Sequence, residues 1–263
     1  SNAMALEGTI EEGADPARIG EALQLAADGV DAGASAGEKI KATETRKQLL
    51  FRAARVFETH AKDMAKAEAA YVAILELDAE DEIAVQGLED ARRALGKHEE
   101  LIEMLLERSQ KHESHSERAR ALNQIGHLYW KELEDREQAA FAFAQALAQE
   151  TKNDEYAADL ERAAGGDMKL WAEALQILSE VTTHPNMPAE AKIALFTRLG
   201  SWYSEKIARP DMGLPCFQAV LSVDPAHDGA LEGVAQVYRR AQQWGELAQV
   251  LLSRADRAAT PAQ

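Results

Sequence analysis

The sequence predicts an all-α fold, a solenoid of about six antiparallel helical hairpins that follow one another along the chain. Three observations support this prediction. Alanine and leucine are abundant among the 263 residues, while aromatic residues make up only 6%, a composition that suits packed helices better than sheets. Large apolar residues recur at the spacing of one helix face. The same arrangement of small and aromatic residues then returns along the chain, as it does in repeat proteins.

Three long hairpins can be aligned on two aromatic residues and one small residue. In each, a small residue follows the first aromatic residue after 10 positions, a second aromatic residue follows after 4 more, and a turn after a further 8. The sets are Phe57, Ala67, Tyr71 and Ala79; Tyr129, Ala139, Phe143 and Thr151; and Tyr203, Gly213, Phe217 and Pro225. We interpret the small residue as the point where two helices cross closely, with the second aromatic ring filling the space beside it.

Shorter hairpins are predicted between the long ones. Their second helices begin near His98, Trp171 and Trp244, which lie 73 positions apart in both steps. The chain therefore alternates two hairpin types in a double-length repeat. The six hairpins are expected at residues 43–79, 80–111, 116–151, 153–181, 188–225 and 226–257.

The two ends of the chain lie outside this repeat region of residues 43–257. Residues 16–42 are predicted to hold a short amphipathic helix, capped by Asp15, and a linker at 31–37 that is rich in Gly, Ala and Ser. The helix either caps the solenoid or is the second helix of a hairpin that lacks its first half. Residues 1–15 are expected to be a tag remnant and a disordered N-terminus, and residues 258–263 a C-terminal tail.

The long hairpins resemble the tetratricopeptide repeat, whose signature carries a Leu-Gly pair, a Tyr, and then Ala, Phe and Pro. The hairpins around Gly126 and Gly200 match it best, and the one around Leu88 departs from it, with Glu89 in the glycine column and Arg92 in the aromatic column. The resemblance covers residues 43–257. It implies a right-handed superhelix with a groove, lined by the first helices, that takes a peptide or a helix.

Carried onto this chain, the groove columns of that family give a polar patch as the candidate partner-binding site. Its residues are Arg120, Asn123, His127, Trp130, Lys131 and Arg162. The alternative is that these are ordinary exposed polar residues, and that Trp130 packs against the adjacent hairpin instead of anchoring a partner. The same columns in the last two hairpins give Thr197, Ser201, Ser204, Glu205, Glu232, Gln236, Arg239 and Arg240.

The net charge of the chain limits the classes of partner that it is expected to bind. The formal net charge is −16, with 45 acidic and 29 basic residues. Such a surface repels phosphate groups, so we expect neither nucleic acid nor a membrane as partner, and a protein or peptide with a basic patch is favoured.

Cys216 is the only cysteine, which excludes an internal disulfide and a thiolate metal cage. Its apolar neighbours Leu214 and Phe217 predict a buried core residue.

The sequence carries no catalytic or nucleotide-binding motif, so no enzyme activity and no cofactor are expected. His112 and His115 lie three positions apart but lack further ligands nearby, so no metal site is expected. Gly165-Gly166-Asp167 is interpreted as a tight turn. Neither a spanning apolar run nor a signal peptide is visible, which favours a cytoplasmic location.

These observations favour a non-catalytic interaction scaffold or adaptor. The alternative is a docking or regulatory segment of a larger protein, an enzyme among the options, that associates with itself through its last hairpin. In that hairpin Trp244, Leu247 and Leu251 form a predicted terminal surface, because no further helix is visible to cover them.

Overall fold

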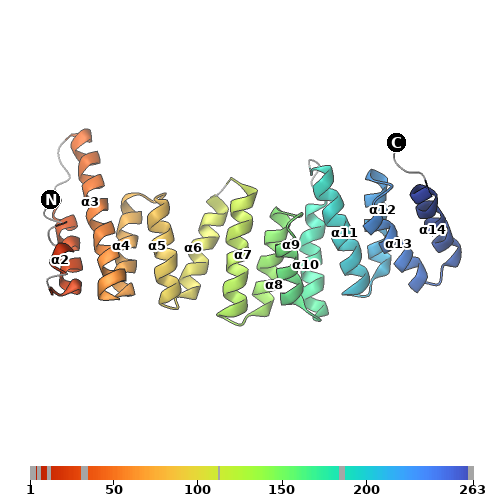
Figure 1. Ribbon diagram of the computed structural model, residues 1–263, viewed down its shortest axis with the longest axis horizontal. Coiled ribbons are helices and arrows are strands. Elements are labelled where there is room, and N and C mark those ends of the chain that lie inside the picture. The colour runs from red at the N-terminus through yellow and green to blue at the C-terminus, as the bar shows by residue number, and fades with distance from the viewer. Residues whose placement is uncertain are drawn as a thin grey trace. The chain divides into compact units, whose positions relative to one another are not determined.

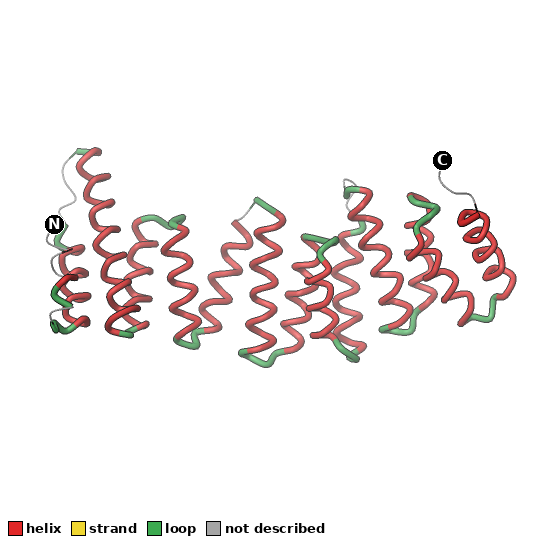
Figure 2. Tube along the Cα trace, viewed as in Figure 1, coloured by secondary structure: helices red, strands yellow, loops and turns green. Residues whose placement is uncertain are grey.

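The computed structural model describes residues 4, 7–10, 13–30, 35–111, 113–183 and 187–259. Every regular element among these residues is a helix, as Figure 2 shows in red, and consecutive helices are joined by short turns (Figures 1 and 2). The predicted all-α fold of repeated hairpins is therefore confirmed. The chain divides into two compact units, Ser1–Leu101 and Ile102–Gln263, and each is described by itself below.

The first unit begins with helix α2 and ends within α6. Its elements are α2 (Pro16–Asp28), α3 (Ala36–Val56), the π-helical turn η1 (Phe57–Ala61), α4 (Met64–Leu77), α5 (Glu82–Ala94) and the start of α6 (His98–Lys111). Helices α2, α3, α4 and α5 pack in chain order, each on the next. Helix α2 also packs on η1, where Gly20 lies against the ring of Phe57, and this ring is fully buried.

Helix α3 begins earlier than predicted, at Ala36, inside the segment expected to be a linker. The cause is a capping box. The Ser35 Oγ accepts a hydrogen bond from the Glu38 backbone N–H at 3.3 Å, and the Glu38 carboxylate accepts one from the Ser35 N–H at 2.8 Å. Residues 31–34 of the predicted linker lie outside the described residues, as do most of the predicted tail and part of the predicted disordered N-terminus.

The second unit holds four hairpins that follow one another along the chain. The first helices are α7 (His115–Lys131), α9 (Asp154–Ala164), α11 (Ala189–Glu205) and α13 (Asp228–Arg240). The second helices are α8 (Arg136–Gln149), α10 (Met168–Val181), α12 (Pro210–Val223) and α14 (Trp244–Ala259). The long hairpins α7–α8 and α11–α12 are the most extensively packed pairs (Figure 1). Asp135 caps α8 by accepting a hydrogen bond from the Gln138 N–H at 3.0 Å.

The turn inside each long hairpin repeats the same backbone conformation. Lys62, Glu134 and Ala208 all have positive φ, at 55°, 54° and 53°. Each is followed by the residue that precedes the second helix, and an N–H at this turn returns to a carbonyl near the end of the first helix, as from Asp135 to Tyr129 at 2.8 Å. Gln242 has the same conformation, at 57°, in the short hairpin α13–α14. Unlike residues thus adopt one left-handed conformation, so the turn imposes it and not the residue type.

Aromatic rings of the second helices press on glycines of the first helices. A Cβ atom built on Gly126 would lie 2.5 Å from the ring of Phe143, and one built on Gly200 would lie 2.6 Å from the ring of Phe217. Phe217 also lies against Gly233 of the next hairpin, where a Cβ atom would come within 2.3 Å of its ring. Because no side chain fits between ring and backbone, glycine is required for this approach.

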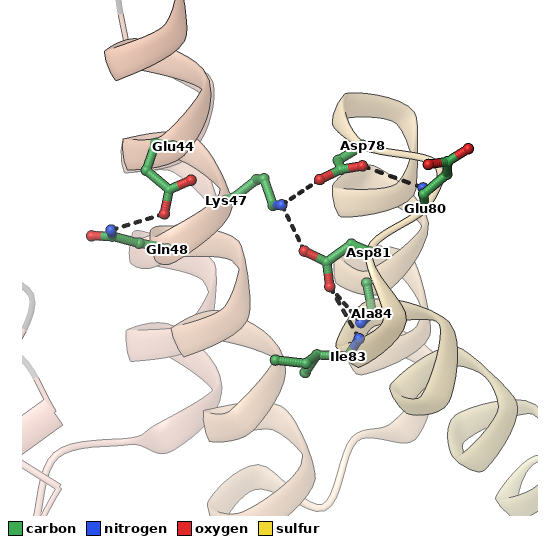
Figure 3. Close-up of polar contacts among 8 residues, drawn as sticks. All are labelled: Glu44, Lys47, Gln48, Asp78, Glu80, Asp81, Ile83 and Ala84. Atoms are coloured by element: carbon green, nitrogen blue, oxygen red, sulfur yellow. Dashed lines mark hydrogen bonds and ion pairs between the residues drawn. The ribbon is translucent and has the colours of Figure 1, made fainter.

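In the first unit, an ion-pair cluster joins α3 to the start of α5 (Figure 3). The Lys47 ammonium lies 2.7 Å from the Asp78 carboxylate and 2.6 Å from that of Asp81. Asp81 also caps α5, since its carboxylate accepts hydrogen bonds from the N–H groups of Ile83 and Ala84. The hydrogen bond from Lys47 holds the pKa of Asp78 below its ordinary value of 3.8. Because the pKa of Asp78 is lower in the folded state, its pairing with Lys47 stabilises the fold above about pH 4. This stabilisation is lost as the pH falls further.

The glycine contacts give a direct stability prediction. Gly200→Ala is expected to lower the free energy of unfolding by about 1–3 kcal/mol, because the added methyl group forces Phe217 or the helix to move. Gly245→Ala on α14 is the matched control: nothing lies within 4 Å of its Cβ position, so stability should be unchanged or rise by at most ~1 kcal/mol. Urea denaturation measures both, and equal effects of the two variants would contradict close packing at Gly200.

Candidate functional site

The first helices of the second unit form one continuous surface, which we call the first-helix face. Neighbouring helices along it are joined by side chains. His127 of α7 lies 3.2 Å from the Asp159 carboxylate of α9. The Trp202 Nε1–H of α11 donates to Glu161 of α9 at 2.9 Å, and an Arg240 guanidinium N–H of α13 donates to the carbonyl of Ser204 in α11 at 3.3 Å. Of the residues in these contacts, His127, Ser204 and Arg240 belong to the predicted groove columns, and the groove itself stays a prediction.

Asp159 is the buried centre of a polar cluster at the α7–α9 end of this face. Its side chain is 2% exposed, and it pairs with the Arg162 guanidinium one turn later on the same helix. The His127 Nε2 lies at ion-pair distance from it but outside hydrogen-bond geometry. The His127 ring packs edge-on against the Phe143 ring, with centroids 5.1 Å apart and planes at 74°. The buried Oδ1 of Asn123 and Nδ1 of His127 have no hydrogen-bond partner.

The six residues predicted to hold a partner occupy different environments. Arg120 and Lys131 are exposed on α7, whereas Asn123 is 9% exposed and lies inside the protein instead of on an open surface. Trp130 is half-buried against the core cluster around Trp171, and the Arg136 guanidinium lies over its ring at 5.7 Å. The remaining two residues, His127 and Arg162, belong to the polar cluster with Asp159.

Sequence reasoning missed Asp159, the residue that organises this cluster. The available signal was an acidic residue in the apolar stripe of α9, next to Leu160 and three positions before Arg162. Its partner His127 lies 32 positions away, so local periodicity could not connect the two.

In the middle of the second unit, α9, α10 and α11 are joined by side chains around two buried tryptophans. Trp202 lies against Trp171, with ring centroids 5.3 Å apart, and the Lys206 ammonium lies over the Trp171 ring at 5.4 Å. Glu161 accepts the Trp202 N–H and pairs with Lys206 at 3.6 Å. The Glu161 carboxylate is thus engaged by two side chains of the protein itself.

Between α11 and α13 the same face is hollowed, with a volume of about 200 Å³. The rings and methyl groups of Phe217 and Val237 lie among its apolar walls, and Gly229 and Gly233 contribute no side chains. The other lining residues are polar and are all among those that the groove columns assign: Ser201, Ser204, Glu205, Glu232, Gln236 and Arg240.

Charges at the hollow are unevenly engaged. The Arg254 guanidinium of α14 donates to Glu232 at 2.5 Å, and this hydrogen bond lowers the pKa of the Glu232 carboxyl. Arg240 is tied to the carbonyl of Ser204. Glu205 is exposed at the rim, where its carboxylate can accept a hydrogen bond from a bound group.

The predicted terminal surface on α14 is partly corrected by the structure. Trp244 and Leu251 are 61% and 42% exposed, and Leu252, which was not predicted, is 63% exposed. Leu247 is only 7% exposed, because α14 packs on α13, so it does not belong to this surface.

Other groups singled out in the sequence do not form a reactive site. Cys216 is half-buried beside the core cluster around Trp171, and burial raises the pKa of its thiol to about 11, so it stays protonated at neutral pH. His112 lies outside the described residues, while His115 contacts the side chain of Gln149 at 2.9 Å. Gly165 lies in a turn and accepts the Trp171 indole N–H.

Among the described residues, no group of three or more His, Cys, Asp or Glu side chains could hold a metal ion. None of the helices in this part of the chain is both long and apolar enough to cross a bilayer.

Comparison with known proteins gives similarity in solved structures alone. No family model matches the chain, and no curated protein matches it. The P58(IPK) TPR domain aligns with 92% of this chain and 73% of its own, at 18% identity and a TM-score of 0.41. YrrB, a TPR protein with an unusual peptide-binding site, aligns with 73% of this chain and 95% of its own, at 20% identity and a TM-score of 0.36. The yeast Sti1 TPR2AB domain, in complex with pHSP90, aligns with 80% and 90%, at 14% identity and a TM-score of 0.35.

The burial of Asp159 predicts an asymmetric response to mutation. Arg162→Ala leaves a buried carboxylate without its cation and should cost about 2–4 kcal/mol of stability. The double variant Arg162→Ala with Asp159→Ala removes that charge as well, so it should be more stable than Arg162→Ala alone. Chemical denaturation of the variants measures this, and a cost below ~0.5 kcal/mol for Arg162→Ala would mean that the pair behaves as a surface ion pair.

Proposed function

We propose that this chain is a protein-interaction scaffold whose first-helix face binds a segment of a partner protein. The observation that carries the proposal is the hollow between α11 and α13. It lies on a continuous helical face, has apolar walls from Phe217 and Val237, and carries a polar rim. An apolar pocket with hydrogen-bonding groups at its edge is the usual arrangement for an anchor residue of a bound segment.

The state of the ionisable groups supports binding as the role of this face. Asp159, Glu161 and Glu232 each have a cationic side chain of the chain itself as partner. A general acid or base needs a proton-exchanging group that is free to reach a substrate. The pairs of Glu161 with Lys206 and of Glu232 with Arg254 join neighbouring helices, which keeps a binding surface rigid before the partner arrives.

Charge indicates the chemistry of the partner. The formal net charge of −16 favours a basic protein or peptide through long-range attraction. On α7, the exposed cations Arg120 and Lys131 provide a local exception, and an acidic group of the bound segment would be stabilised there. A segment with basic and acidic ends would match both features.

The proposal is tested with peptides selected by display on the immobilised 263-residue chain. The dissociation constant of the best peptide is then measured by fluorescence anisotropy for the wild type and for Arg120→Glu with Lys131→Glu. The double reversal should weaken binding about tenfold, or ~1.4 kcal/mol. Glu180→Lys on α10 is the control, since Glu180 is exposed on a second helix, and it should leave affinity unchanged.

Two results would contradict the proposal. One is that no peptide is selected above the level obtained with an unrelated helical protein. The other is that the selected peptides bind the double reversal as tightly as the wild type and also protect no amide of the first helices from hydrogen exchange, which would place binding elsewhere.

A further inference from the structure

The hollow between α11 and α13 has a counterpart between α7 and α9, related by a shift of 74 positions. Gly126 and Gly200, Phe143 and Phe217, and the helix caps Asn153 and His227 are each separated by this number. In both places the ring of the second helix lies against the glycine of the first helix, at 2.5 Å and 2.6 Å from a Cβ atom built there. The two grooves therefore have equivalent floors, formed by the ring of Phe143 in one and the ring of Phe217 in the other.

Between α7 and α9 that floor is covered by the chain itself. The imidazole ring of His127 packs edge-on against Phe143, and the carboxylate of Asp159 lies 3.2 Å from its Nε2. Trp130 fills the next position along α7, half-buried against the core. An aromatic ring with a nitrogen at ion-pair distance from a carboxylate thus occupies the space above the floor.

Between α11 and α13 the same positions carry small residues. A shift of 74 places Ser201 at the position of His127, Ser204 at that of Trp130 and Gly233 at that of Asp159. The Ser204 hydroxyl is turned inward and donates to the Gly200 carbonyl at 2.8 Å. The cover is missing, and the hollow of about 200 Å³ lies where it would be.

We propose, building on the proposed interaction function, that this hollow receives an aromatic side chain of the partner that bears an N–H or O–H group, namely Trp, Tyr or His. Its ring packs against Phe217 as His127 packs against Phe143, and its polar group donates to the rim carboxylate of Glu205. The volume, below the roughly 300–1,000 Å³ typical of small-molecule sites, suits one such side chain.

The shape of the hollow favours an aromatic ring over a flexible chain. Edge-to-face contact with Phe217 rewards a flat ring, and such contacts add to the gain from burial alone. Gly229 and Gly233 line the hollow without side chains of their own, and the space directly beside Gly233 is taken by the ring of Phe217. Of the two carboxylates at the hollow, Glu232 is already paired with Arg254, so Glu205 is the carboxylate left to accept the donor group.

Single amino-acid amides test this proposal without a known partner. The isotope-labelled chain of 263 residues is titrated with N-acetyl-tryptophanamide, N-acetyl-tyrosinamide, N-acetyl-leucinamide and N-acetyl-argininamide. The backbone amides of Ser201, Gly229 and Gly233 are followed by NMR. The aromatic amides should shift these signals in a saturable way. At equal concentration, the leucine and arginine amides should shift them less than a third as far.

A variant that fills the hollow can be compared with a variant that carries the same side chain elsewhere. Ser201→His restores the residue found at the equivalent position of α7, so it should fill the hollow and weaken binding of the tryptophan amide at least fivefold. Ser222→His introduces the same side chain at an exposed position of α12 and should leave binding unchanged. Circular dichroism of both variants checks that the helices are retained.

Several outcomes would overturn the proposal. These are equal or larger shifts with leucinamide or argininamide, unchanged binding by Ser201→His, or a change of the same signals when the chain is diluted without any probe, which would mean that a second copy fills the hollow. Selected peptides that bind Ser201→His as tightly as wild type would also refute the proposal that the hollow receives an aromatic side chain, while the interaction function would stand. Failure to select any peptide, with normal binding of the tryptophan amide, would count against the interaction function alone.

Discussion

The approach of an aromatic ring to a glycine in a neighbouring helix is the constraint on which the rest of this structure depends. Phe143 and Phe217 lie so close to Gly126 and Gly200 that no Cβ atom fits between them. At the crossing itself, a Cβ atom on Gly213 would lie 2.6 Å from the Gly200 carbonyl oxygen. These contacts fix how closely the helices of a long hairpin pack, and Phe217 extends the constraint to the next hairpin through Gly233.

A fixed floor allows the residues above it to vary, and this variation distinguishes one groove from the next. Over Phe143 the chain supplies its own cover, His127, held beside the buried carboxylate of Asp159. Over Phe217 it supplies serine and glycine, and an opening results. The same hairpin structure therefore supplies both the packing that stabilises the fold and the opening available to a partner. The residues above the phenylalanine ring decide whether a groove is filled or open.

The sequence predicted the hairpins because their signals are local. Small and aromatic residues at constant spacing gave the long hairpins, and the groove columns gave six residues of the hollow, among them Ser201 and Glu232. The capping box of Ser35 and Glu38 is also a local signal, and missing it misplaced the start of α3. The burial of Asn123 and Leu247, and the role of Asp159, depend on neighbours far along the chain, which no single helix pattern contains.

The most direct measurement of the relation between floor and cover is a crystal structure of His127→Ser, which removes the cover over Phe143. We expect Phe143 to keep its place against Gly126, because the glycine contact positions it, and an opening comparable to that at Phe217 to appear above it. If Phe143 instead swings into the vacated space and leaves Gly126, the cover positions the ring, and the central claim is wrong.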